Sequence, residues 1–333
     1  MNLKPVLSEI ELELQKQVSR LDTPRTEHFH DMLTYHMGWT GEGAGPEATG
    51  KRIRPLLVLL TTASCRADWQ SALPAAAAIE LVHNFSLVHD DIQDNSPTRR
   101  GRDTAWVKWG SPMAINIGDA LFVISNQAIM DLKQHYPPAV VLQAAEILNN
   151  TCLELTRGQY LDLSYEERTD LTVEDYWPMI AGKTAALLSA CCHIGSLLGG
   201  ADDSKQEAYR SFGHYLGLAF QVQDDILGIW GDEEVTGKSA ASDLMEGKNS
   251  LPVLAGLGKK GTFAERWARG PIRSEEVEEV RRSLASEGGL IVAQDASKQM
   301  TDLALMSLRE ADPQGEAGDA LSELADQLLK RDQ

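Results

Sequence analysis

Apolar residues recur at helical spacing along almost the whole chain of 333 residues, whereas the alternating pattern typical of β-strands is rare and short. Segments rich in turn-forming residues, such as 38–50 and 95–102, separate the helical stretches. Helices are predicted near residues 6–20, 25–37, 52–64, 70–94, 112–133, 138–164, 173–199, 203–230, 250–258, 274–287, 290–311 and 316–331. No repeat and no shift in composition marks a boundary. The sequence therefore predicts an all-α fold class, with residues 1–333 forming a single large helical bundle.

The net charge limits the classes of partner. The chain has 31 basic and 49 acidic residues and a formal charge of −18, which argues against binding to nucleic acid or to anionic lipid. The N-terminal sequence lacks the apolar core of a secretion signal, and no stretch approaches the length that a membrane-spanning helix needs. We therefore expect a cytoplasmic protein with no nucleic-acid partner and no membrane span.

The cysteines give no indication of a metal site. Cys65, Cys152, Cys191 and Cys192 lack the spacing of metal ligands, and all four lie among apolar or small residues. We expect reduced thiols with a structural role.

The stretch LVHDDIQDNSPTRRGR, residues 87–102, places three aspartates within five positions and two adjacent arginines shortly after them. On a helical wheel, Asp90 and Asp94 lie one turn apart on the side opposite the apolar stripe, and Asp91 flanks them. Such carboxylates repel one another unless a cation binds. Magnesium takes one or two carboxylates and completes its shell with water and phosphate oxygens, and arginines bind phosphate well. The stretch predicts a magnesium and phosphate site; a solvated acidic face is the alternative.

A second acidic stretch, GLAFQVQDDILGIWGD, covers residues 217–232. The wheel again groups polar residues on one face, with Asp224 and Asp225 among them, and turns the apolar residues away. Lys238 and Lys248 follow this helix. Two acidic helices, each followed by basic residues, suggest opposed acidic walls with magnesium between them and cationic side chains around a diphosphate.

Several segments together strongly resemble the trans-isoprenyl diphosphate synthase, or polyprenyl synthetase, family. They are GKRIRP at 50–55, IELVHNFSLVHDDIQD at 79–94, RRGR at 99–102, GQYLDL at 158–163, GKT at 182–184 and FQVQDDILGIWGD at 220–232. The resemblance runs from about residue 25 to beyond residue 255. It implies an all-α bundle around a deep central cavity, usually in a homodimer. It also implies a transferase of isoprenoid biosynthesis that condenses isopentenyl diphosphate with an allylic diphosphate.

The resemblance also assigns roles to residues. The family's three magnesium ions would be bound by Asp90 and Asp94, which ligate two of them, and by Asp224, which ligates the third, with Asp91 and Asp225 in support. The allylic diphosphate site would comprise Arg99, Lys183, Thr184, Gln221, Lys238 and Lys248. The isopentenyl diphosphate site would comprise Lys51, Arg54, His83 and Arg100. The metal, Arg99, Lys183 and Lys238 would stabilise the leaving diphosphate.

One position departs from the family pattern. The second motif commonly reads DDxxD in the family, and here its last position is Gly228. Asp232 lies one further turn along and is a candidate substitute, although Gly231 makes a continued helix uncertain. We expect the third metal to be held more weakly and not to be lost.

The residues just before the first aspartate bear on product length. In the family, the fourth and fifth residues before it help set the cavity floor, and here they are Ser86 and Phe85. The small Ser86 leaves room below Asp90, whereas Phe85 lies about 7.5 Å down the helix axis. The pattern resembles geranylgeranyl diphosphate synthases more than farnesyl ones. A farnesyl or longer product is the alternative.

Three other functions match the sequence less well. GPEATGKR at 45–52 nearly matches a phosphate-binding P-loop, but the preceding strand is missing and Arg52 stands in place of the hydroxyl residue. A class I terpene cyclase has no need of an isopentenyl diphosphate site, so GKRIRP and the paired arginines count against it. A non-catalytic subunit would be expected to lose one acidic motif, and this chain keeps the first whole and the second nearly so.

Overall fold

The computed structural model describes residues 1–166, 168–231 and 241–329. These residues are helical with short connections, apart from one sheet of two very short strands, which confirms the all-α prediction. Contacts divide the chain into two compact units. Unit 1 is Met1–Cys152, Ala190–Gln206 and Pro313–Leu321, and unit 2 is Leu153–Ser189, Glu207–Asp312 and Ser322–Gln333. A single domain over residues 1–333 stays a prediction.

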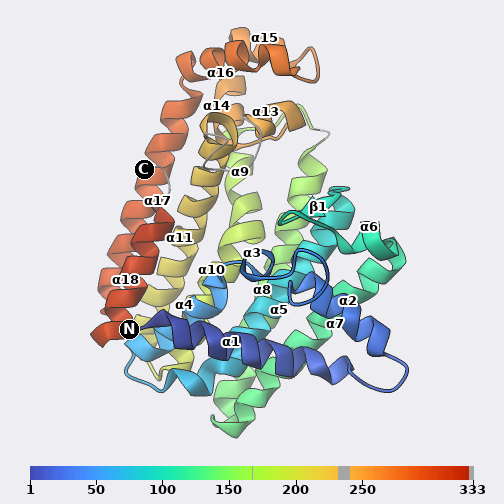
Figure 1. Ribbon diagram of the computed structural model, residues 1–333. Coiled ribbons are helices and arrows are strands. Elements are labelled where there is room, and N and C mark those ends of the chain that lie inside the picture. Colours follow the sequence, from blue (N-terminus) through green and yellow to red (C-terminus); the bar gives the residue numbers. More distant parts are fainter. Residues whose placement is uncertain (167, 232–240, 330–333) are drawn as a thin grey trace. The chain divides into compact units, whose positions relative to one another are not determined.

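Unit 1 is organised around α5 (Leu73–Gln93), which packs along α7 (Ser111–Met130), α4 (Ile53–Ser64) and α1 (Leu3–Val18) (Figure 1). Proline stands in the first turn of α5, where no intrahelical hydrogen bond is lost. A run of buried alanines follows, which allows neighbouring helices to approach closely. The other elements are η1 (Ser19–Leu21), α2 (Glu27–His36), α3 (Pro46–Thr49), η2 (Trp69–Ala72), β1 (Thr98–Arg99), β2 (Arg102–Asp103), α6 (Ala105–Trp109) and η3 (Asp131–Gln134).

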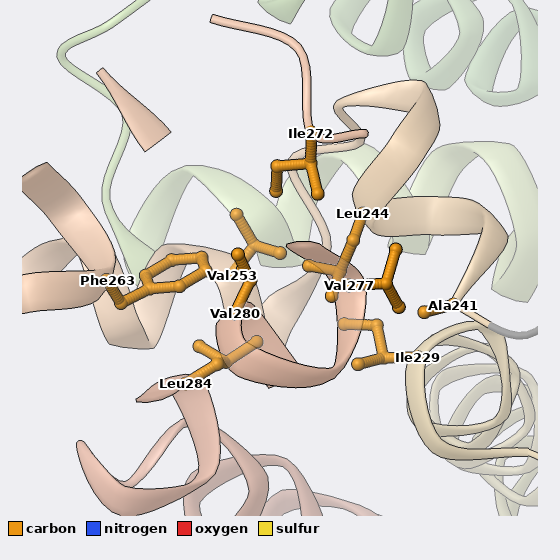
Figure 2. Close-up of a cluster of buried hydrophobic side chains, with 9 residues drawn as sticks. All are labelled: Ile229, Ala241, Leu244, Val253, Phe263, Ile272, Val277, Val280 and Leu284. Carbon is orange, nitrogen blue, oxygen red and sulfur yellow. The ribbon is translucent and has the colours of Figure 1, made fainter. Parts of the chain in front are cut away.

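Unit 2 contains α17 (Gly289–Ala311), which packs on α14 (Leu251–Gly258) and α16 (Val277–Ser286). Figure 2 shows a buried apolar cluster of this unit, formed by Ile229, Ala241, Leu244, Val253, Phe263, Ile272, Val277, Val280 and Leu284. The remaining elements are α9 (Val173–Ile180), the π-helix η4 (Ala181–Ala185), α13 (Ser242–Glu246), α15 (Thr262–Trp267) and η5 (Ser274–Glu276). Four helices have residues in both units: α8 (Pro138–Tyr165), α10 (Ala186–Leu198), α11 (Asp203–Trp230) and α18 (Gly315–Leu329).

Most predicted helices are present, and one is interrupted. The continuous helix expected over 173–199 is α9, the π-helix η4 and α10 in the structure. Pro178 lies inside α9 and cannot donate a backbone hydrogen bond, so the regular pattern is broken just before the π-helix. The short helices α3, α6, α13 and α15 were not predicted, because a helix of four to six residues shows too little periodicity to stand out.

The prediction that no stretch approaches the length of a membrane span was wrong. By length and composition alone, three helical stretches of the described chain are long and apolar enough: Trp69–Gln93, Ser111–Gln134 and Val173–Leu198. Within the fold, 67, 44 and 72% of their apolar windows are buried. A helix that packs on several sides is apolar around much of its circumference, which explains the composition of the first of these stretches, centred on α5.

The cysteines agree with the sequence interpretation. None of the four, all of which lie in the described part of the chain, forms a disulfide. Burial raises the pKa of Cys152 to about 11 and that of Cys192 to about 12, so both remain protonated thiols.

Candidate active site

The first acidic motif stands at the C-terminal end of α5, and its aspartates have different surroundings. Asp90 is half-buried, and Asp94, the C-cap residue one turn later, is exposed. Asp91 is only 2% exposed and accepts a hydrogen bond from Nε of Arg99 at 2.7 Å. Burial raises the pKa of Asp91 to about 6, although the charge of Arg99 acts in the opposite direction. The motif therefore offers Asp90 and Asp94 to a ligand and uses Asp91 to hold Arg99.

The arginines after this motif lie on a hairpin and point to different partners. Thr98 pairs with Asp103 and Arg99 with Arg102, so Arg100 and Gly101 form a two-residue turn with positive φ at both positions. Arg100 donates to the carbonyls of residues 48 and 49, both at 2.9 Å. Arg102 instead donates to backbone carbonyls of residues 35, 40 and 42 and stacks over the Tyr35 ring at 3.9 Å. The hairpin thus keeps Arg99 and Arg100 near each other and uses Arg102 as a structural clamp.

A small pocket of unit 1 is lined by His36, Asp91, Arg99, Arg100 and neighbouring residues. Nε2 of His36 is buried and has no hydrogen-bond partner among the described residues. Burial, followed by the charges of Arg100 and Arg99, lowers the pKa of His36 to about 3. The positive charge at this pocket therefore comes from the arginines, with a neutral imidazole beside them.

The GKRIRP segment leads into α4 and distributes its basic residues over different environments. Lys51 is exposed, whereas Arg52 is 4% exposed and pairs with Glu11 at 2.6 Å and Glu80 at 2.8 Å. Nη1 of Arg54 lies 3.2 Å from Nε2 of His83, and burial, then the charge of Arg54, hold the pKa of His83 well below its usual range. The structure thus brings together Arg54 and His83, and their binding of a diphosphate stays a prediction.

The second acidic motif lies near the end of α11, in unit 2. Asp224 is half-buried, whereas Asp225 is 6% exposed. The Asp225 carboxylate accepts hydrogen bonds from the Tyr176 hydroxyl at 2.7 Å, from the Gln221 amide at 3.0 Å and from the backbone N–H of Leu251 at 3.1 Å. Burial nevertheless raises the pKa of Asp225 to about 6. As in the first motif, one aspartate of the pair is accessible and the other organises its neighbours.

The GKT segment forms part of the π-helix η4, a local irregularity that is frequent at functional sites. A Cβ built on Gly158 would lie 2.1 Å from the backbone nitrogen of Lys183, so α8 and η4 touch backbone to backbone there. One turn after Gly158, Asp162 accepts a hydrogen bond from Nζ of Lys183 at 2.5 Å. Thr184 donates to Gln221 at 2.8 Å. Lys183 and Thr184 are thereby fixed by side chains of α8 and α11.

The basic residues after α11 are only partly described. Nζ of Lys248 lies 2.8 Å from Glu246 and 3.4 Å from Asp243, and the lysine is exposed. Lys238, the other predicted lysine, and Asp232, the candidate substitute for the missing aspartate, lie outside the described residues. The predicted arrangement of Asp90 and Asp224 on opposed acidic walls stays a prediction.

The donor chemistry fits a magnesium site that the substrate completes. Within the described ranges, no three His, Cys, Asp or Glu side chains converge closely enough to hold a metal ion by themselves. Magnesium is commonly bound by one or two carboxylates together with water and substrate phosphates, and seldom by an all-protein cage. Asp90 and Asp94, one turn apart at the end of α5, match that requirement.

Some residues at these sites were not found from the sequence. Asp162, which belongs to the GQYLDL segment, accepts a hydrogen bond from Lys183. The Tyr176 hydroxyl donates one to Asp225. The ion pairs of the buried Arg52 with Glu80, which is also buried, and with the half-buried Glu11 fix the segment between Lys51 and Arg54. GQYLDL gave a sequence signal for Asp162, whereas nothing in the local sequence distinguishes Tyr176 from a core aromatic.

Comparisons with known proteins identify the family. A sequence profile of the polyprenyl synthetase family matches residues 45–284. A geranylgeranyl diphosphate synthase of Mycobacterium tuberculosis is 40% identical over 287 residues, which are 84% of this chain and 81% of that protein. A (2E,6E)-farnesyl diphosphate synthase of the same organism is 41% identical over 257 residues, which are 77% of this chain and 69% of that protein.

A solved structure is also similar. The polyprenyl synthase of Caulobacter crescentus, complexed with calcium and isoprenyl diphosphate, superposes with a TM-score of 0.76 at 30% identity. The alignment covers 95% of this chain and 97% of that one. Together with the profile match over more than half of its length, this shows that the chain belongs to the polyprenyl synthetase family.

Proposed function

We propose that the chain is a magnesium-dependent trans-prenyltransferase that condenses isopentenyl diphosphate with an allylic diphosphate, with geranylgeranyl diphosphate as the product. Membership of the family and the names of the relatives support the class of reaction. The proposal depends most on the surroundings of the Arg54 guanidinium group. Its Nε is buried and has no hydrogen-bond partner among the described residues, while its other end lies against the neutral His83. An anionic ligand would satisfy this donor.

The roles of the residues follow from their surroundings. Arg54 and His83, with the exposed Lys51 and with Arg100 on its hairpin, would bind the diphosphate of isopentenyl diphosphate. Arg99, held by Asp91, and Lys183, held by Asp162, would face the allylic diphosphate and stabilise the charge that develops on it. Thr184, Gln221, Lys238 and Lys248 are assigned to the same diphosphate.

The metal is assigned to the accessible aspartates. Asp90, Asp94 and Asp224 would hold three Mg²⁺ ions together with the allylic diphosphate, while Asp91 and Asp225 keep their supporting positions. Bound magnesium would supply further charge stabilisation to the departing diphosphate. Loss of that group leaves an allylic cation, which the double bond of isopentenyl diphosphate attacks. The released diphosphate can accept the proton that is then lost, so no side-chain base is assigned.

Product length is assigned to the aromatic residues of α5 and α7. Phe85 is half-buried. The centroid of its ring lies 5.2 Å from the ring centroid of Phe122 and 5.0 Å from that of His89. Ser86, whose hydroxyl donates to the carbonyl of His83, leaves space below Asp90. A floor at Phe85 rather than at Ser86 favours a longer product than farnesyl diphosphate. Farnesyl diphosphate stays the alternative product, because one of the similar proteins is a farnesyl diphosphate synthase.

We also propose a cytoplasmic homodimer. Large apolar side chains are exposed along α7 and at the start of α8: Met113, Ile115, Val123, Met130 and Leu142. An exposed apolar surface of this kind is typical of a subunit interface, and a second copy of the chain is the partner that the resemblance implies.

Incubation of the purified protein with Mg²⁺, radiolabelled isopentenyl diphosphate and each allylic starter tests the proposal. Formation of geranylgeranyl diphosphate, identified by chromatography, is the expected result. Incorporation of label into a shorter or longer chain would correct the length alone. Conversion of the allylic diphosphate to a cyclic hydrocarbon without use of isopentenyl diphosphate would favour a class I cyclase. Absence of any turnover with every starter would favour the non-catalytic subunit.

A further inference from the structure

Arg52 is a buried cation that stands between two residues assigned to isopentenyl diphosphate, Lys51 and Arg54. Its guanidinium group is engaged from two sides. Nε and Nη2 donate to Glu11 of α1 at 2.6 and 3.3 Å, and Nη1 donates to Glu80 of α5 at 2.8 Å. Arg52 is therefore used within the fold and is not offered to a ligand, although its neighbours in the sequence are.

The backbone shows how firmly Arg52 is held. Arg52 is the N-cap residue of α4 and has a φ of 49° and a ψ of 38°, in the left-handed region that residues with a side chain seldom adopt. Such a conformation costs free energy, so it persists only where the surrounding contacts determine it. The ion pairs with Glu11 and Glu80 are contacts of that kind. They fix the direction in which the chain enters α4, and with it the position of Arg54.

Glu80 is a buried carboxylate, 3% exposed, whose influence extends beyond Arg52. The oxygen that binds Arg52, Oε1, also accepts a hydrogen bond from the Asn84 amide at 3.1 Å. Burial lowers the pKa of Arg54 and that of Arg100, and in both cases the charge of Glu80 is the strongest influence in the opposite direction. Glu80 thus acts on Arg52 by direct contact and on the other two arginines through its charge.

A buried carboxylate that loses its cationic partner is strongly unfavourable, so Glu80 needs a guanidinium group beside it. Arg54 is the arginine best suited to replace Arg52 in this role. It follows Arg52 by two residues, it is reached by the charge of Glu80, and its buried Nε has no hydrogen-bond partner among the described residues. An Arg54 that paired with Glu80 would be lost to an anionic ligand, because both anions compete for the same donors.

From these contacts we infer that Arg52 is a positioning residue: it neutralises Glu80 and so keeps Arg54 for the diphosphate of isopentenyl diphosphate. Arg52 itself touches no substrate. Without it, the carboxylate of Glu80 would act as an internal competitor of that diphosphate. The inference rests on the proposed function and explains why a third basic residue stands between Lys51 and Arg54.

Two substitutions and their combination test this role. Arg52→Met keeps a long side chain and removes the charge, which leaves Glu80 without its partner. Glu80→Gln removes the competing charge but keeps an amide oxygen for Arg52. The double variant contains neither charge, and a buried ion pair can often be replaced by uncharged residues without loss of the fold. Glu11→Gln is the matched control, because it removes the other carboxylate partner of Arg52 and leaves Glu80 paired.

Calorimetric titration with isopentenyl diphosphate, without divalent metal and without an allylic substrate, is the main measurement. We expect Arg52→Met to weaken binding by about 10- to 100-fold, the range for loss of a hydrogen bond to a charged group. Glu80→Gln should bind at least as tightly as the wild type, and the double variant should recover most of the loss. Glu11→Gln should stay close to the wild type. In turnover, Arg52→Met should raise the KM for isopentenyl diphosphate and leave that for the allylic diphosphate unchanged.

Circular dichroism and thermal unfolding establish that each variant is folded. If Arg52→Met does not fold, Arg52→Lys takes its place. Its single ammonium group keeps the charge but cannot bind Glu11 and Glu80 as the guanidinium fork does. We therefore expect a smaller loss of affinity, which Glu80→Gln again reverses.

The inference fails if Arg52→Met, or Arg52→Lys in its place, binds isopentenyl diphosphate as tightly as the wild type. It also fails if the double variant stays as weak as Arg52→Met, since the loss would then come from packing and not from Glu80. A Glu11→Gln protein that loses as much affinity as Arg52→Met would contradict it too, as would a wild type that binds no isopentenyl diphosphate in this titration. A wild type that binds the compound but forms no product refutes the proposed function alone.

Discussion

At the scale of single residues, the two adjacent aspartates of each acidic motif have opposite environments. Asp90 and Asp224 are half-buried, whereas Asp91 and Asp225 are 2% and 6% exposed and are held by side-chain partners. Neighbouring residues on a helix point about 100° apart, so only one of a pair can face a ligand while the other faces the packed interior. Each motif thus combines a more accessible carboxylate with a buried one that fixes the surrounding side chains.

Replacement of Asp90 by alanine should reduce turnover by orders of magnitude, because a carboxylate assigned to the metal is lost while the helix keeps its packing. Steady-state product formation measures the effect, and circular dichroism checks the helix content. Gln93→Ala, on the exposed side of the same turn, is the control and should stay near wild-type turnover. Near-normal turnover of the Asp90→Ala variant would refute the assignment.

Asp225 should make stability depend on pH. Burial raises the pKa of Asp225 in the folded protein to about 6, whereas its pKa in the unfolded chain is near 4. The contribution of Asp225 to the stability of the folded protein is therefore fully present below a pH of about 4 and is lost as the pH rises through about 6. In metal-free protein, the wild type should therefore gain stability relative to Asp225→Asn as the pH falls from 7 to 4. Thermal unfolding of both proteins across this range provides the measurement. A constant difference between them would contradict the raised pKa.

At the scale of elements, two contacts between helices bring side chains of the candidate site together. One is the contact of α5 with α7, and the other is the contact of α8 with η4. Phe85 of α5 meets Phe122 of α7, and His89 packs over Gly118, where a Cβ would lie 2.2 Å from its Nε2. In unit 2, the close approach at Gly158 brings Asp162 to Lys183. Helix packing, and not local sequence, decides these pairs.

Replacement of Phe85 by alanine should lengthen the product, because the aromatic pair with Phe122 loses one ring and the assigned floor is lowered. Chromatography of the radiolabelled products measures chain length. Phe122→Ala is the matched variant on the other helix and should act in the same direction. A Phe85→Ala protein with an unchanged product would remove Phe85 from the floor.

At the scale of the whole molecule, the exposed apolar side chains of α7 should belong to an interface between two copies. Val123 is 54% exposed and lies in the middle of that helix, so Val123→Glu places a charge in the proposed contact. We expect the wild type to sediment as a dimer and the variant to shift towards monomer. Ile291→Glu on α17, where the residue is 62% exposed, is the control. A wild type that sediments as a monomer at all concentrations would refute the dimer.

The amino-acid sequence was enough to predict the helical class, the position of most long helices and the two acidic motifs. These depend on periodicity and on residues close together in the chain, which a single sequence displays. It did not reveal the π-helix at Lys183 and Thr184, because a shift from four- to five-residue hydrogen bonding leaves the apolar pattern nearly unchanged. The prediction that no stretch approaches the length of a membrane span failed for α5, whose apolar composition suits burial among neighbouring helices.

The packing of the helices determines which aspartate of each pair is buried, which side chains hold Lys183 and Asp225, and that Asp243 lies against Gly228. Each of these depends on a contact between residues far apart in the sequence. Such contacts are set by the packing of whole helices through their apolar faces, and the polar partners meet as a result. Chemistry could be predicted from residue types and spacing, whereas the partners of each group followed from the fold.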